Sequence, residues 1–153
     1  MPGAFHDKAA IDYSYYMQTV QAAAGDMKLI GHMVFFLEQA VEKMLRQVLE
    51  DCQISAPLLS QVPELALQLK KALPHLNNKD IDDLTGDLGL QIASWDLSGR
   101  YSTGFMPDID SIDRAEKIYG DLITLDAMLV AKAAERERSE YTDHFKQFAS
   151  QRA

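Results

Sequence analysis

The sequence predicts an all-α protein, folded as an antiparallel up-and-down bundle of about five helices. Apolar residues recur every three or four positions along several long segments, as in helices with one buried face. The connections between these segments are short and contain Gly, Pro, Ser and Asn, and no segment requires a β-strand. Helices that each carry one apolar stripe and are joined by short turns bury those stripes most simply by packing side by side.

Composition and length indicate one soluble domain that can bury a core of its own. The chain has 153 residues, of which 47% are hydrophobic and 25% charged. Its net charge of −8 disfavours nonspecific binding to nucleic acid or to an anionic membrane, so any polyanion site would have to be local. A single cysteine, Cys52, and the lack of a long apolar run predict a cytoplasmic protein without membrane contact.

The first two helices are expected over residues 8–24 and 27–51. In the first, one face is marked by Ile11, Tyr15, Thr19 or Val20, and Ala22 or Ala23. The second has the strongest helical pattern in the chain, and its apolar stripe consists of Ile30, Met33, Val34, Leu37, Ala40, Val41, Met44, Leu45 and Val48. Its opposite face is polar and carries Glu38, Gln39, Glu42, Lys43, Arg46 and Gln47. Such a face is usually solvated, with Glu42 and Arg46 spaced for an ion pair.

The middle of the chain predicts a short helix over 63–73 and a longer fourth helix that starts near Lys79. Gly86 and Gly89 fall within the fourth helix, where they cost stability unless a neighbouring helix packs closely. Ser98 and Gly99 are expected to end it, so that a loop runs from Arg100 to Asp108.

The fifth helix is expected to begin at Asp110 and Ser111. Its apolar stripe consists of Ile112, Ala115, Ile118 or Tyr119, Leu122, Leu125, Leu129 and Ala133. Beyond Ala134 the sequence becomes charged, which divides the chain into a bundle over 1–134 and a charged helical tail over 135–153. Phe145 and Phe148 in this tail would dock back onto the bundle or meet a partner chain.

No motif for metal, cofactor or nucleophilic chemistry is found. The four histidines are scattered through the sequence, and one cysteine cannot form a zinc signature. Aspartates cluster at 80–87 and 108–113, but both clusters fall at expected helix starts, where carboxylates favourably meet the helix dipole. We therefore expect no metal site and no cofactor.

Two segments resemble HEPN domains. The first is Phe35-x-x-x-Gln39-Ala40-x-Glu42-Lys43-x-x-Arg46-x-x-Leu49, which is similar to the second-helix signature of that family. The second is Trp95-Asp-Leu-Ser-Gly-Arg100-Tyr101, which resembles the aromatic and Arg-Tyr segment at the end of the family's fourth helix. The resemblance covers roughly residues 8–133.

The resemblance implies a binding module for a nucleotide or an RNA-like anion, with a nucleotidyltransferase as a possible partner in a toxin–antitoxin type of system. Arg100 and Tyr101 would form an anion-binding corner with the polar face that carries Gln39, Glu42, Lys43 and Arg46. Many HEPN proteins are metal-independent ribonucleases that use an arginine followed after four to six residues by a histidine. Here those positions after Arg100 hold Phe105, Met106 and Pro107, so we expect no nuclease activity.

Two alternatives remain open. Arg138 and His144 have the nuclease spacing, so the chain could be a ribonuclease toxin with a displaced catalytic histidine. It could also be a structural dimerisation protein. A homodimer is expected in any case, because related domains commonly pair and because Phe35, Phe36 and the aromatic cluster Tyr13, Tyr15 and Tyr16 add apolar surface.

Overall fold

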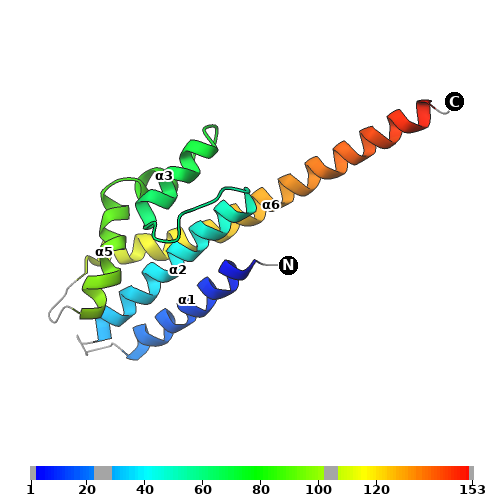
Figure 1. Cartoon of the computed structure of the whole chain (residues 1–153). Helices are drawn as coiled ribbons and strands as arrows, with labels where there is room; N and C mark the ends of the chain where they lie inside the picture. Colours follow the sequence, from blue (N-terminus) through cyan, green and yellow to red (C-terminus); the bar gives the residue numbers. More distant parts are fainter. Residues whose placement is uncertain (1–2, 23–28, 102–106, 152–153) are drawn as a thin grey trace.

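The computed structural model describes residues 3–22, 29–101 and 107–151, with side chains except those of residues 97–101 and 151. Over these residues the chain forms α-helices and no strand, which confirms the all-α bundle (Figure 1). The helices are α1 (Ala4–Ala22), α2 (Ile30–Asp51), α3 (Val62–Ala72), α4 (Lys79–Leu84), α5 (Asp87–Tyr101) and α6 (Ile109–Gln151).

Helix α2 is the centre of the bundle and packs against α1, α3, α5 and α6. The apolar stripe predicted for it is confirmed, since its members from Val34 to Val48 are fully buried. The polar face was predicted less well. Glu38 and Gln47 were expected to be solvated, yet they are only 2% and 1% exposed, because neighbouring helices cover α2 on more than one side.

The buried face of α1 differs from the predicted one. Ile11 and Tyr15 are 56% and 49% exposed, whereas Tyr16 is buried and donates a hydrogen bond to Glu116 of α6. Tyr13 stacks on Tyr119 of α6 with ring centroids 4.2 Å apart. Apolar residues are spread around α1, so tertiary packing, chiefly against α2 and through these two side chains against α6, decided which side is buried.

The aromatic residues that were expected to add apolar surface at a dimer interface make contacts within the chain. Tyr16 is 1% exposed, and Tyr13 and Phe36 pack against the core. Phe36 also contacts the rings of Tyr15 and Phe35, at centroid distances of 5.4 Å each. Much of this cluster is therefore used inside one chain.

The predicted fourth helix is in fact two helices, α4 and α5, separated at Thr85 and Gly86. A Cβ atom on Gly89 would overlap the carbonyl oxygen of Leu84, so only glycine allows α5 to start this close to the end of α4. The close approach that we expected at a glycine pair thus exists at Gly89, against the last residue of α4. Helix α5 also continues to Tyr101, past the expected end at Ser98.

Helix α6 runs without interruption from the bundle into the predicted tail. Its first half packs on α2, and the predicted stripe from Ile112 to Leu125 is buried. Its second half projects beyond the other helices (Figure 1), and residues 135–150 are exposed throughout. Phe145 and Phe148 remain 61% and 49% exposed, so they do not dock back onto the bundle. Along the described residues, no helix is both long and apolar enough to cross a membrane.

Candidate functional site

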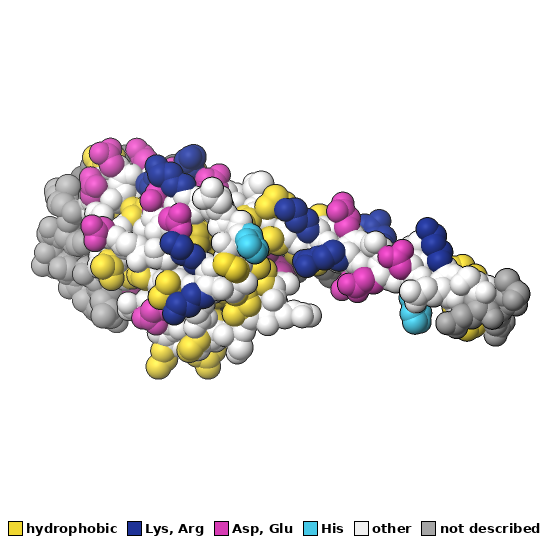
Figure 2. All heavy atoms as spheres, turned by 90° about the horizontal axis from the view of Figure 1, so that it is seen from above, with side chains coloured by type: hydrophobic (Ala, Val, Ile, Leu, Met, Phe, Trp, Pro, Cys, Tyr) yellow, Lys and Arg dark blue, Asp and Glu magenta, His cyan; other side chains and the backbone are white. Residues whose placement is uncertain are grey.

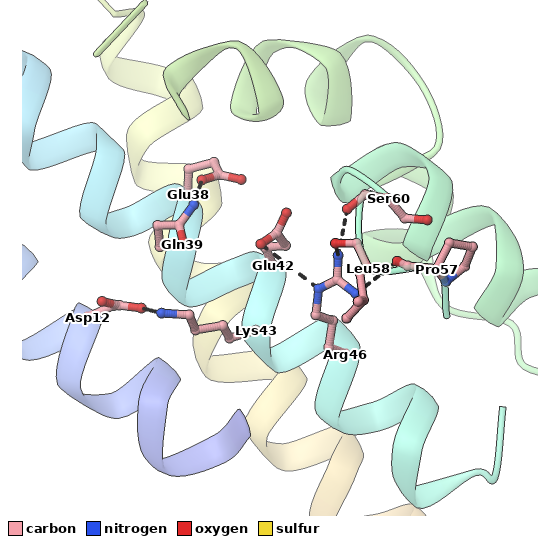
Figure 3. Close-up of polar contacts among 9 residues, drawn as sticks. All are labelled: Asp12, Glu38, Gln39, Glu42, Lys43, Arg46, Pro57, Leu58 and Ser60. Carbon is pink, nitrogen blue, oxygen red and sulfur yellow. Dashed lines mark hydrogen bonds and ion pairs between the residues drawn. The ribbon is translucent and has the colours of Figure 1, made fainter. Parts of the chain in front are cut away.

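The polar face of α2 was the predicted binding surface, and its side chains are engaged in contacts within the chain (Figure 3). Lys43 forms an ion pair with Asp12 of α1, where the two side chains are 25% and 14% exposed. Gln39 donates a hydrogen bond of 2.7 Å to the neighbouring Glu38. The Lys43–Asp12 pair joins α1 to α2 and leaves the Lys43 charge neutralised by a carboxylate.

Arg46 braces the loop that leads into α3. Its guanidinium donates hydrogen bonds to the carbonyl oxygens of Pro57, Leu58 and Ser60, at 3.1, 2.9 and 2.8 Å. The side chain is only 10% exposed, and Nε lies 4.0 Å from Glu42. A guanidinium whose donors already meet three carbonyls has little capacity left for a phosphate.

Glu42 adds a carboxyl group, and not a cation, to the polar face of α2. Burial raises the pKa of its carboxyl, the neighbouring Asp96 of α5 raises it further, and Arg46 and Lys43 act in the opposite direction. The buried Glu38 lies one turn earlier on α2. The middle of the predicted corner is therefore rich in carboxyl groups, which disfavours an anion at that point.

Arg100 and Tyr101 belong to the last turn of α5, not to the loop that the sequence predicted. Their side chains lie outside the described part of the structure, as do Phe105 and Met106. By register, Arg100 is one helical turn after Asp96, and α5 packs on α2. The anion-binding corner at Arg100 stays a prediction. Arg46 cannot serve as its second cation, because the guanidinium is already bonded to the loop before α3.

Arg138 and His144, the alternative nuclease pair, both lie on the exposed second half of α6. Residues six positions apart on a helix point about 120° away from each other around its axis. The two side chains therefore do not converge on one phosphate within a single chain. No other described element packs beside them there to complete a site.

A cavity of about 610 Å³ lies between the start of α4 and the middle of α6. Arg114 lines it and forms ion pairs with Asp80 at 2.7 Å and Asp83 at 2.8 Å. Asp121 also lines it, and a hydrogen bond with Asp80 raises the pKa of the Asp121 carboxyl. Arg114, Asp80 and Asp121 are thus engaged in contacts within the chain, and Lys79 and Lys117 also line the cavity. Among the described residues, no three His, Cys, Asp or Glu side chains are placed to hold a metal ion.

Sequence reasoning missed a pair of carboxyl groups between α2 and α6. Asp126 is 8% exposed, and its Oδ1 is buried without a hydrogen-bond partner among the described residues. Burial and a hydrogen bond with Asp51 raise the pKa of Asp126 to about 7. The signal was available, because Asp126 stands directly after Leu125 in the apolar stripe of α6. Burial also raises the pKa of the nearby Cys52 thiol, which lowers the fraction present as the reactive thiolate.

Comparisons of the chain with protein-family models, with curated proteins and with solved structures found no match. The resemblance to HEPN domains therefore remains a prediction from two sequence segments.

Proposed function

We propose that the chain is a structural dimerisation protein, a helical module whose function is to self-associate. The observation that supports this proposal is the exposure of large apolar side chains outside the bundle core, and two of the surfaces that carry them hold at least two each. One surface is the loop before α3, where Leu58 and Leu59 are 88% and 94% exposed. The other is the projecting half of α6, where Tyr141 and Phe145 are 73% and 61% exposed. Exposed apolar groups gathered in this way are typical of surfaces that bind another protein.

Light scattering coupled to size-exclusion chromatography tests the proposal on the full chain. At tens of micromolar we expect twice the chain mass of 17.2 kDa, with the monomer appearing on dilution. A mass near 17.2 kDa at every concentration up to several hundred micromolar would overturn it.

A second candidate function follows from the resemblance to HEPN domains, namely binding of a nucleotide or RNA-like anion by Arg100 and Tyr101, with a nucleotidyltransferase as partner. The packing of α5 on α2 supports it, because it brings the two resembling segments onto neighbouring helices. Calorimetric titration of a nucleotide panel into wild type and Arg100→Ala is the test. Binding lost in Arg100→Ala but kept in Arg46→Lys would establish this site, and no binding by wild type would remove it.

A further inference from the structure

The projecting half of α6 carries a regular apolar seam. We call residues 131–151 the arm, and the arm seam consists of Ala131, Ala134, Arg138, Tyr141, Phe145 and Phe148. Its members follow one another at alternating spacings of three and four residues, the pattern of a helix that pairs with another helix. Small residues occupy the end of the seam near the bundle, and aromatic residues occupy the far end.

The order of side chains along the seam makes it complementary to itself in one orientation only. When two arms run antiparallel, Phe145 of one copy meets Ala134 of the other, and Phe148 meets Ala131. Each of these outer layers then holds one large and one small side chain, which close-packed interfaces require. When the arms run parallel, Phe145 would meet Phe145 and Ala134 would meet Ala134, so that loosely filled layers gather at the bundle end and crowded layers at the far end.

Charge favours the same orientation. The antiparallel register sets Arg138 opposite Tyr141 of the other copy, where a guanidinium and its stem can lie against an aromatic ring. A parallel register would set Arg138 against Arg138, a like-charge contact in the centre of the interface. Beside the seam, Glu137 would face His144 of the second copy. A polar residue inside an otherwise apolar seam commonly fixes the register and orientation of paired helices.

The bundle does not obstruct this pairing. The exposed Ala127 and Val130 continue the same side of α6 toward the bundle, and Val130 is 47% exposed. The arm carries four acidic and four basic residues, whereas the whole chain has a net charge of −8. Figure 2 shows the two signs interspersed along the arm, so two arms can approach without the repulsion that acts between two bundles.

The area is sufficient for a dimer of moderate affinity. Given about 200 Å² of surface for a large aromatic side chain, Tyr141, Phe145 and Phe148 expose roughly 350 Å² per copy. Two copies provide about 700 Å² from these rings alone, and a specific interface needs about 1,200 Å² in total. The alanines and the methylene stems along an arm of about 30 Å can supply the remainder.

We infer that two copies of this chain pair through the arm seam in antiparallel orientation, so that the aromatic end of each arm covers the alanine end of the other. This inference rests on the proposed self-association and assigns its surface and geometry. The occupant of the seam is a second copy because the seam's own sequence supplies both the large side chains and the small ones that they need.

Sedimentation of Phe145→Ser on the arm and of Leu59→Ser on the other exposed apolar surface, the loop before α3, tests which of the two surfaces pairs. Both replace an exposed apolar residue outside the core, at 61% and 94% exposure, so both should fold and keep the wild-type melting temperature when monomeric. We expect Phe145→Ser to weaken dimerisation at least tenfold and Leu59→Ser to leave it unchanged. A dimer weakened by Leu59→Ser but not by Phe145→Ser would overturn the arm seam while the proposed function stands. A monomeric wild type would overturn both.

Cross-linking tests the orientation. In a Cys52→Ser background, Glu137→Cys and His144→Cys chains are prepared separately and then mixed with a short thiol-specific cross-linker. An antiparallel pair predicts covalent dimers in the mixture and little product from either variant alone. Product from each variant alone, without gain on mixing, indicates parallel arms and refutes the proposed geometry. Phe145→Ser added to both chains should abolish the product.

Discussion

Replacing Arg46 with alanine should cost about 2–3 kcal/mol of unfolding free energy, because the residue holds the loop before α3 by three hydrogen bonds to carbonyl oxygens. The bond to Ser60 is partly buried, and a lost bond from a charged donor there costs about 1.5 kcal/mol. The carbonyl oxygens of Pro57 and Leu58 are exposed, so water replaces the guanidinium at about 0.5 kcal/mol each. In a chain of this size the loss corresponds to a fall of about 5–10 °C in melting temperature.

Thermal and urea unfolding of Arg46→Ala, Arg46→Lys and Lys43→Ala measure this effect. Arg46→Lys should lose about half as much, because an ammonium group cannot reach the separate carbonyls as a planar fork does. Lys43→Ala removes one partly exposed ion pair and should cost no more than about 1 kcal/mol. Hydrogen exchange should accelerate at the Ser60 amide, which bonds to the Pro57 carbonyl, only in the Arg46 variants. If Lys43→Ala is the more damaging substitution, the structural role assigned to Arg46 is wrong.

Three further measurements test the structure. Folded Asp126 keeps its proton up to about pH 7, whereas the unfolded chain releases it near 3.8, so the stability due to this proton is full below 3.8 and lost as pH rises through 7. Asp126→Asn should therefore be more stable than wild type by about 2 kcal/mol at pH 8 and equally stable near pH 4. The upper limit for the difference is ~4 kcal/mol, and it is reduced because water reaches Asp51. Urea titrations that show no pH-dependent difference in stability between the two proteins would contradict this prediction. Gly89→Ala should lower the melting temperature by more than 5 °C, because its Cβ would overlap the Leu84 carbonyl and force α4 and α5 apart, and Gly120→Ala, where a Cβ meets nothing, is the control. Purified protein should not cleave labelled single-stranded RNA or tRNA in EDTA, and cleavage abolished by His144→Ala would instead establish the displaced nuclease site.

The sequence predicted the fold well where one helix face carried a strong apolar stripe. On α2 and the first half of α6 the stripe identified the buried residues almost one by one, because burial there follows helical periodicity. On α1, apolar residues surround the helix, and the choice of face depended on packing against α2 and on Glu116 and Tyr119 of α6, which are about a hundred positions away in the chain. Long-range partners of this kind leave no local trace.

The candidate site was harder to predict than the fold, for an electrostatic reason. Arg46 and Lys43 stand on the side of α2 that a helical wheel assigns to solvent. The sequence pattern cannot distinguish a cation that is available to bind a ligand from one that is bonded to a carbonyl or a carboxylate of the same chain. The distinction depends on the return of the loop over 57–60 and on the approach of Asp12, both set by tertiary packing. Asp126 was recognisable in principle, because a carboxylate next to Leu125 in an apolar stripe must either find a partner or keep its proton.

The uninterrupted course of α6 has a mechanical consequence. Its 43 residues correspond to a rod of about 65 Å, and no proline or glycine between Gly120 and the end of the helix provides a pivot. The helix therefore forms one continuous connection between the far end and the core. Inserting seven residues near 135–140 would lengthen this rod by two turns at almost constant phase, whereas inserting five would turn the far end by about 140° relative to the bundle. The distance and the angle at which this chain holds whatever binds its tip are thus fixed by residue count alone.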